Sequence, residues 1–485
     1  MPKNEDTEAM FVGDRTQLML DDRLIAQGRG IRRRFHRPQR VGGALIRPDA
    51  RWEQDKSIGL YGSVMREEGL FRAWYFLSSE NTRSVCYAES EDGVRWSKPR
   101  LGLHELDGSR ENNVVISGPD GGGSVWKDPR SAKGERYQTQ QKAYPGYPDN
   151  PQPSQFRRYV SPDGLHWQRA PIELEGPWDT QSVVFWDERI ERYVMYTREW
   201  FRFDDKHRNY RAVRRLESDD LVHWDNQSVV MEADETDLNL AETPTGQPPV
   251  DYYGAAVFRY PDAGDLYIML PQAFWHWGRP NEKIINEEGR EELAPGTIDA
   301  RLAWSHDGIH FRRPEARGAF LPTGPDGRFD SRLVWIMPDP IAVGEQLWFY
   351  YAGRNWDHHG RLDPVADRRL SGIGRAVLRK DGFASVDAGH ATGDFTTPPL
   401  EFSGAQLVIN AEIGGGGFVR VEIQDESGQP LEDYGADDTL PTTGNSTQLT
   451  VCWREGPDIS QLAGQKVRVR FLLRDCRLYS FQFET

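Results

Sequence analysis

Acidic side chains recur just before strand-like apolar runs of this sequence. Asp179, Asp251 and Asp330 each precede such a run, and Asp49 and Glu53 precede an earlier one. If these runs line one hollow, ionised carboxylates would repel one another, and the pKa of at least one should rise. A protonated carboxyl group beside an ionised one is the pair that glycoside hydrolysis uses. All five acids are therefore candidate catalytic residues.

Each of these acids also has a structural interpretation. An Asp before a strand often caps a turn by accepting hydrogen bonds from its own backbone. Recurrence before three equivalent runs favours function for Asp179, Asp251 and Asp330. Asp128 instead aligns with Asp187, in the turn after a first strand, which predicts a turn role for it.

Basic and aromatic residues near the same runs complete a candidate carbohydrate site. Aromatic faces and guanidinium groups are suited to sugar rings and to hydroxyl or carboxylate groups. The segment Phe274-Trp275-His276-Trp277 is a candidate platform for a sugar ring, with a packed loop as the alternative. The candidate substrate-binding residues are Arg198, Glu199, His36, Arg332, Tyr253, Trp275 and His276.

The sequence lacks the motifs of dinucleotide binding, of serine hydrolases and of zinc sites. No Gly-x-Gly-x-x-Gly opens a helix after a strand, and Gly-x-Ser-x-Gly is absent. The pairs His358-His359 and Cys452/Cys476 lack zinc-ligand spacing. The two histidines either reach the candidate site or face solvent, and solvent is the expectation. We expect no metal ligands and no required cofactor. The acid content is compatible with a structural Ca²⁺ in the central channel of the fold predicted below.

A repeated phrase indicates the fold that would bring these residues together. Four copies, beginning at Ser90, Ser161, Ser218 and Ser305, read Ser-x-Asp with an aromatic residue four positions after the Asp. A degenerate fifth copy spans 379–383. The Asp positions are 92, 163, 220, 307 and 381, so the spacing is 57 to 87 residues. Asp-Gly marks hairpin turns, and this spacing accommodates one four-stranded blade. The repeat predicts an all-β fold, a five-bladed β-propeller.

The phrase ends near residue 394, and a different pattern follows. Val419, Val421 and Ile423 alternate with polar residues, as do Val469 and Phe471. One-sided alternation predicts a small C-terminal β-sandwich. We expect residues 1–393 to form the propeller and 394–485 the sandwich. The run 18–25 is expected to complete the last blade and close the ring.

Charge, apolar content and cysteine count limit the partners and the location that we expect for this protein. The net charge of −15 argues against nucleic acid and against an anionic membrane surface. No apolar run reaches membrane-spanning length, and residues 1–13 lack a signal-peptide pattern. A cytoplasmic location is the expectation, or secretion if a signal peptide has been removed. Three cysteines imply no disulfide framework. The sequence does not distinguish a monomer from a homo-oligomer.

The stretches 87–99 and 179–187 resemble bacterial five-bladed propeller proteins related to glycoside hydrolase families 32 and 43. The C-terminal segment is similar to the sandwich that follows the propeller in family 32. The resemblance implies three carboxylates, one each from blades one, two and three, and Asp179 stands near the blade-three acid position. The sequence departs from the family at blade one, where Asn-Asp-Pro-Asn-Gly is absent, and at blade three, where Glu-Cys and Glu-Gly-Pro are absent. Asp128 matches the blade-two Asp-Pro only superficially.

The leading hypothesis is a glycoside hydrolase that acts on an oligosaccharide, for example a furanoside. One alternative is a phosphorylase on the same fold, with Arg332, Arg354 and His358 holding phosphate. Another is a carbohydrate-binding protein without catalysis. Retention or inversion depends on the separation of two carboxyl groups, which the sequence does not give.

Overall fold

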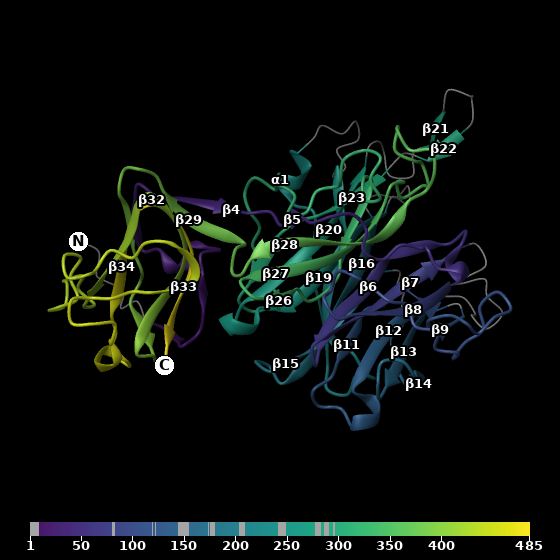
Figure 1. The fold of residues 1–485 in the computed structure, drawn as a ribbon, viewed down its shortest axis with the longest axis horizontal. Helices are drawn as coiled ribbons and strands as arrows, with labels where there is room; N and C mark the ends of the chain where they lie inside the picture. The colour runs from purple at the N-terminus through teal and green to yellow at the C-terminus, as the bar shows by residue number, and fades with distance from the viewer. Residues whose placement is uncertain are drawn as a thin grey trace.

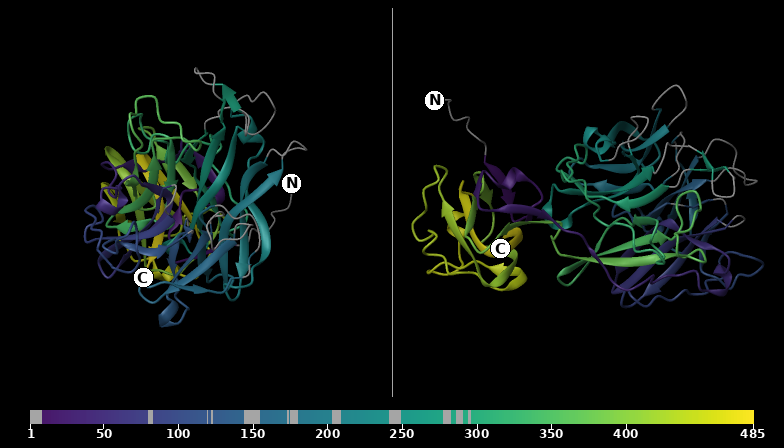
Figure 2. Two further views of the ribbon diagram at one scale, coloured as in Figure 1. Left: turned by 90° about the vertical axis from the view of Figure 1, so that its right-hand side faces the viewer. Right: turned by 90° about the horizontal axis from the view of Figure 1, so that it is seen from above.

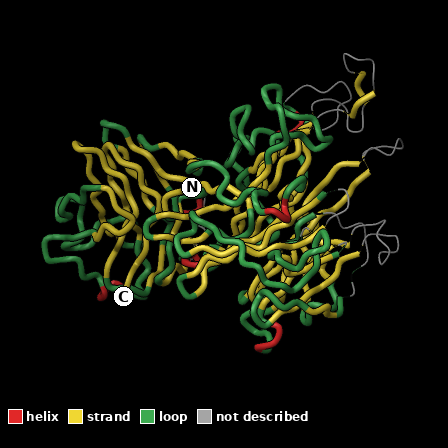
Figure 3. The backbone as a smooth tube through the Cα atoms, turned by 45° about the vertical axis from the view of Figure 1, so that its right-hand side comes forward, coloured by secondary structure: helices red, strands yellow, loops and turns green. Residues whose placement is uncertain are grey.

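The computed structural model describes residues 9–79, 83–118, 120–121, 123–143, 155–172, 174, 180–202, 209–240, 249–276, 283–285, 291–293 and 296–485. Its regular structure is almost entirely β (Figures 1 and 3). The four-residue α1 (Glu235–Leu238) is the single α-helix among the described residues. No helix in these ranges is long and apolar enough to cross a membrane. The all-β fold class is confirmed.

Five groups of strands follow one another along the chain, as the hairpin repeat predicts. The first is β6 (Ser57–Glu67), β7 (Leu70–Ser78), β8 (Arg83–Ser90) and β9 (Val114–Ser117). The second is β10 (Asp120–Gly121), β11 (Val125–Lys127), β12 (Tyr137–Ala143), β13 (Gln155–Ser161) and β14 (Gln168–Ala170). The third is β15 (Val183–Asp187), β16 (Arg192–Arg202), β17 (Asn209–Ser218) and β18 (Asp225–Met231). The fourth is β19 (Val250–Arg259), β20 (Tyr267–His276), β23 (Gly296–Ala300) and β24 (Ala303–Ser305). The fifth is β25 (Leu333–Ile336), β26 (Ile341–Val343), β27 (Gln346–Arg354) and β28 (Ser371–Arg379).

Each group contacts the next, and the fifth contacts the first. The Val125 amide donates to Ser63 Oγ (2.8 Å) between the first two groups, and the Tyr196 hydroxyl donates to the Gly308 carbonyl (2.7 Å) between the third and fourth. The Tyr350 hydroxyl donates to the Gly93 carbonyl (2.8 Å) and so joins the fifth group to the first. The groups therefore succeed one another as the blades of a propeller do.

A short N-terminal strand, and not the expected run, completes the last blade. β5 (Gln39–Arg40) pairs antiparallel with β28, and Ile46 forms a bridge with Ile373. The expected run 18–25 lies elsewhere, because β2 (Gln17–Leu18) pairs with β34 (Arg468–Glu484). The prediction that an N-terminal segment closes the ring is right, but its assignment to residues 18–25 is wrong.

The repeated hairpins share one hydrogen-bond pattern. In the second copy Ser161 Oγ accepts from the Gly164 amide (2.9 Å), and Asp163 Oδ1 accepts from the amides of Leu165 and His166 (2.8 Å each). The copies at Ser90, Ser218 and Ser305 repeat these bonds. In the first blade the outer strand is β9, which follows the hairpin after a long connection. The Ser and Asp side chains thus fix the turn geometry.

A tyrosine of each of three blades binds an acid of the preceding blade. The Tyr193 hydroxyl donates to Asp128 Oδ2 (3.0 Å), and the Tyr267 hydroxyl donates to Asp187. The Tyr137 hydroxyl donates to Glu67 in the same way (2.5 Å). Asp128 also caps its turn by accepting from the Arg130 amide (2.9 Å), as the alignment with Asp187 predicts.

β21 (Lys283–Ile285) and β22 (Glu291–Leu293) pair with each other. Strands from both ends of the chain form a second all-β unit. Its sheet runs β3 (Gln27–Arg29), β30 (Gly393–Thr396), β34, β29 (Ala384–Ala388), β4 (Arg32–Phe35), with β32 (Gln406–Gln424) pairing β34. Figure 2 shows the purple N-terminal strands beside the yellow C-terminal ones. The division therefore differs from the expected 393/394 boundary, which falls inside β30.

Strand alternation explains the core of this second unit. Val419, Val421, Ile423, Val469 and Phe471 are fully buried, as the sequence pattern predicts. Their neighbours in one cluster include aromatic residues of β30 and β34. The three cysteines carry free thiols, which agrees with the absence of a disulfide framework.

Candidate functional site

Six polar and aromatic side chains of blades three to five meet in one cluster, which we call the Asp251 cluster. Two come from β19, one each from β16, β17 and β20, and one from the loop that follows β27. Its members are Arg198, Arg211, Asp251, Tyr253, His276 and His358. Four of them, Arg198, Asp251, Tyr253 and His276, are sequence-predicted site residues.

Asp251 is fully buried and lies between two basic side chains. Its Oδ2 accepts from the Arg211 amide (3.0 Å) and from Arg211 Nη1 (3.1 Å), and His276 Nε2 is 3.4 Å away. Oδ1 has no hydrogen-bond partner among the described residues. Burial alone would raise the pKa of Asp251, but the charges of Arg211 and His276 and their hydrogen bonds outweigh it and lower this pKa. Asp251 is therefore an ionised carboxylate at neutral pH.

Tyr253 is packed on several sides by charged and aromatic groups. The guanidinium carbons of Arg198 and Arg211 lie 4.0 and 4.8 Å from its ring centroid, within cation–π range. Arg198 Nε donates to the Tyr253 carbonyl (3.1 Å), and the Tyr253 hydroxyl is 3.0 Å from His358 Nε2. His358 is half-buried in this contact, so the expectation that it faces solvent is wrong, whereas His359 is exposed.

The axis of the propeller is filled beneath this cluster. The Trp335 indole donates to Gln181 Oε1 (2.8 Å), and Gln181 Nε2 donates to the Gly62 carbonyl (2.9 Å). These three residues belong to the fifth, third and first blades. A Cβ on Gly254 would lie 2.8 Å from Thr180 Oγ1, so the close approach of the inner strands requires glycine there.

Asp330 and Glu53 are buried carboxylates, and each forms an ion pair outside the Asp251 cluster. Asp330 binds Arg40 Nε (2.7 Å) and accepts from the Tyr351 hydroxyl (2.9 Å). Glu53 is also fully buried; it binds Lys98 Nζ (2.5 Å) and accepts from the Tyr75 hydroxyl (2.6 Å). Each carboxylate binds partners outside the Asp251 cluster, so the structure does not bring either of them into one site with Asp251.

Three further candidates also have partners elsewhere. Asp49 is exposed and binds Lys98 Nζ (2.8 Å). His36 lies at the second unit, where its Nε2 is 2.8 Å from Ser385 Oγ, and burial lowers its pKa. Arg332 binds Asp326 (2.8 Å).

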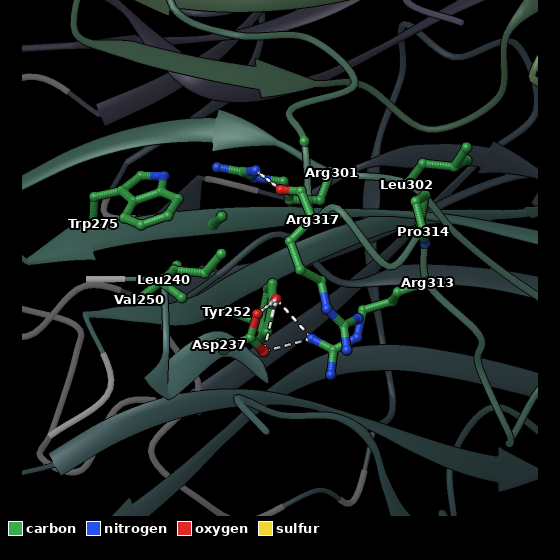
Figure 4. A pocket seen from close by; sticks show the side chains of 12 residues that line it. Asp237, Leu240, Val250, Tyr252, Trp275, Arg301, Leu302, Arg313, Pro314 and Arg317 are labelled. Atoms are coloured by element: carbon green, nitrogen blue, oxygen red, sulfur yellow. Dashed lines mark hydrogen bonds and ion pairs between the residues drawn. The ribbon is translucent and has the colours of Figure 1, made fainter. Parts of the chain in front are cut away.

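Glu199 and Trp275 alternate with cluster residues and point to the opposite strand faces. Glu199 binds Arg214 (3.1 Å). The Trp275 indole donates to Asp299 Oδ2 (3.2 Å). Figure 4 shows Trp275 lining a pocket in which Arg313 hydrogen-bonds Asp237 and Tyr252. That cavity of about 10 Å³ has room for one water molecule, so it is too small for a sugar ring, and the aromatic platform stays a prediction.

Asp179 and Trp277 lie outside the described residues.

Sequence reasoning did not select Arg211. The signal that could have found it is its place opposite Trp200 in the hairpin of β16 and β17. Arg211 pairs with Trp200 across the antiparallel ladder, and the guanidinium carbon of Arg211 lies 4.7 Å from the Trp200 ring centroid.

No group of three or more His, Cys, Asp and Glu side chains in the described ranges is arranged to hold a metal ion. The expected optional Ca²⁺ stays a prediction.

Comparison with known proteins gives structural similarity only. No family model and no curated protein sequence matches the chain. An N-acetylgalactosamine deacetylase from F. plautii in complex with blood group B trisaccharide is similar at 15% identity and a TM-score of 0.45, over 73% of this chain and 97% of that one. A glycosyl hydrolase from Bacteroides ovatus has 12% identity and a TM-score of 0.44, over 71% of this chain and 94% of that one.

A β-1,2-mannobiose phosphorylase from Listeria innocua, in complex with β-1,2-mannobiose, has 12% identity and a TM-score of 0.45, over 70% of this chain and 96% of that one. At these identities the similarities concern the fold alone.

Proposed function

We propose that the protein hydrolyses a glycosidic bond of an oligosaccharide at the Asp251 cluster. The observation that carries this proposal is the convergence of Asp251, Arg211, His276 and Tyr253 from adjacent blades. The hairpin motifs that resemble propeller glycosidases support the same reaction class. Fold alone would not establish it, because one fold hosts many functions.

The cluster supplies groups that recognise sugar hydroxyls. Asp251 Oδ1 is an acceptor without a partner and Arg211 Nε is a donor without a partner, both among the described residues. A sugar hydroxyl group can donate to the first and accept from the second. The cluster therefore offers a matched acceptor and donor for a sugar hydroxyl. Dependence on inorganic phosphate is what separates hydrolysis from phosphorolysis.

Asp251 is not a suitable proton donor, because its lowered pKa keeps it ionised. In the proposed site it therefore orients the sugar and stabilises positive charge that develops on the ring. Asp179 is proposed as the carboxylate that assists the attacking water, on the strength of its place near the blade-three acid position of the resembled family.

A panel of oligosaccharides, including furanosides and uronides, tests the proposal when it is incubated with and without inorganic phosphate. We expect phosphate-independent sugar release, reduced at least about 100-fold in Asp251→Asn and in Asp179→Asn, in line with the usual worth of a positioned polar group. Asp107→Asn, at an exposed carboxylate bound to Lys56, is the matched control and should retain full activity.

Two outcomes would contradict the proposal. Release that requires phosphate would assign a phosphorylase. Binding of a glycan without any release would assign a carbohydrate-binding protein.

A further inference from the structure

Three buried acids that the sequence selects as catalytic leave one role unfilled. Cleavage of an unactivated glycoside needs a proton on the departing oxygen. Asp330 and Glu53 are enclosed by Arg40 and Lys98, and Asp251 is held ionised. None of these three carboxyl groups can deliver that proton.

The Asp251 cluster contains another pair with transferable protons. The Tyr253 hydroxyl and His358 Nε2 are 3.0 Å apart, a hydrogen-bond distance, and they come from blade four and blade five. The tyrosine ring is also fixed from other sides. It makes edge contacts with Trp335 (5.4 Å between centroids) and Phe274 (5.8 Å), in addition to the two guanidinium groups. Such packing holds a reacting group in one geometry before substrate arrives.

We propose that Tyr253 and His358 form the proton relay that protonates the leaving group, an inference that rests on the proposed hydrolysis. The glycosidic carbon–oxygen bond breaks while the Tyr253 hydroxyl gives its proton to the departing oxygen. The protonated His358 passes its Nε2 proton to the tyrosine oxygen, so that Tyr253 is restored and His358 becomes neutral. Water adds its hydroxyl to the sugar carbon and loses its second proton to solvent, from which His358 is protonated again.

Charged groups surround the Tyr253–His358 pair on several sides. Arg198 and Arg211 face the ring, Asp251 and His276 lie behind Arg211, and His359 and Asp357 flank His358 in its loop. The loop itself is fixed, because Asp357 Oδ1 accepts from the amides of His359 (2.9 Å) and Arg361 (3.0 Å). His358 therefore approaches Tyr253 from a defined backbone position.

The alternative is that His358 merely satisfies a buried tyrosine hydroxyl, and the neighbouring residue provides the matched control. The Tyr252 hydroxyl points to the opposite face of β19 and binds Asp237 and Arg313. Tyr252→Phe and Tyr253→Phe each remove one largely buried hydroxyl from the same strand. Only Tyr253→Phe should change the chemistry of the leaving group.

The experiment compares methyl glycosides with 2,4-dinitrophenyl glycosides of the sugars in the panel, because the dinitrophenolate leaves without a proton. For Tyr253→Phe and His358→Gln we expect kcat/KM on the methyl glycoside to fall at least about 100-fold, and on the dinitrophenyl glycoside less than about tenfold. Tyr252→Phe should affect both substrates equally, and thermal denaturation reports whether each variant is folded.

Equal losses on both substrates in folded Tyr253→Phe would overturn the relay and leave the hydrolase intact. The same holds if Asp179→Asn, and not Tyr253→Phe, shows the difference between substrates. If the wild type cleaves neither class of glycoside, the proposed function fails, and the relay falls with it.

Discussion

At the scale of single residues, two fully buried carboxylates of this protein are paired with basic side chains from distant segments. Glu53 binds Lys98, which is 45 residues away in the sequence, and Asp330 binds Arg40, which is 290 residues away. Of the sequence-predicted residues, the structure brings Asp251, Tyr253, Arg198 and His276 together, whereas Asp330, which the sequence places at an equivalent position to Asp251, binds Arg40 elsewhere. The sequence cannot predict which acids are neutralised, because those partners depend on loops that have no periodic pattern.

The pair Glu53–Lys98 gives a stability prediction. Lys98→Met would leave a fully buried carboxylate without its cation, which typically costs about 3–5 kcal/mol. The double variant Glu53→Gln/Lys98→Met should recover part of that loss, since no uncompensated charge remains. Urea-induced unfolding measures both. A loss below about 1 kcal/mol for Lys98→Met would show that the pair contributes little.

At the scale of elements, the repeated hairpins link stability to pH. Burial raises the pKa of Asp163, but hydrogen bonds from His166 and Leu165 outweigh it and lower the pKa to about 2. In Asp92, hydrogen bonds from the amides of Arg95 and Val94 lower the pKa. A pKa that is lower in the folded state than the unfolded value of about 3.9 stabilises the protein above that pH.

We therefore expect the melting temperature to fall as the pH decreases from about 4 towards 2, since these carboxylates then become protonated. Asp163→Asn should be less stable at pH 7 and should show a shallower decline, because one titrating turn is removed. Differential scanning calorimetry across this range checks both. An unchanged slope would mean that the turn does not contribute to the pH dependence.

The same turns explain where sequence reasoning succeeds and where it ends. Gly164 has a φ of +77°, and a Cβ there would lie 2.6 Å from Trp74 Cζ2, so the Asp-Gly signal reflects a real steric requirement. The outer strands carry no comparable signal. β5 has two residues, and β9 follows a long connection, so neither shows a readable alternation. The expected closing strand at 18–25 was misplaced for that reason.

The glycine in this turn provides a second prediction at this scale. Gly164→Ala combines left-handed backbone strain with a clash against Trp74, and should cost at least about 1–2 kcal/mol. Gly102→Ala is a control at a similar φ (+72°), with nothing within 4 Å of the added Cβ. Thermal denaturation of the pair separates the two contributions. Equal losses would show that contact with Trp74 adds nothing to the backbone strain.

At the scale of the whole molecule, the propeller is inserted between two neighbouring strands of the second unit. Phe35 at the end of β4 is opposite Ala384 at the start of β29. The chain leaves the second unit at residue 36, runs through the propeller, including the closing strand β5, and returns at 383 (Figure 1). Sequence alternation identifies the C-terminal strands but gives no indication that β1 (Met10–Gly13) to β4 join them.

We expect a fragment of residues 36–383 to fold, because it retains every strand of the five blades and β5. A fragment of residues 1–383 should be more prone to proteolysis, since β2, β3 and β4 lose their partners β34, β30 and β29. Limited proteolysis with mass spectrometry compares the two. If both fragments were degraded equally, the propeller would depend on the second unit.

The filled axis determines how a sugar chain can pass through the molecule. Trp335, Gln181 and Gly62 join three blades across the centre, and the Trp335 side chain is inaccessible to solvent. A polysaccharide therefore cannot thread through the ring. A substrate that reaches the Asp251 cluster must approach from one rim, and its products must depart by that same rim before the next molecule can enter.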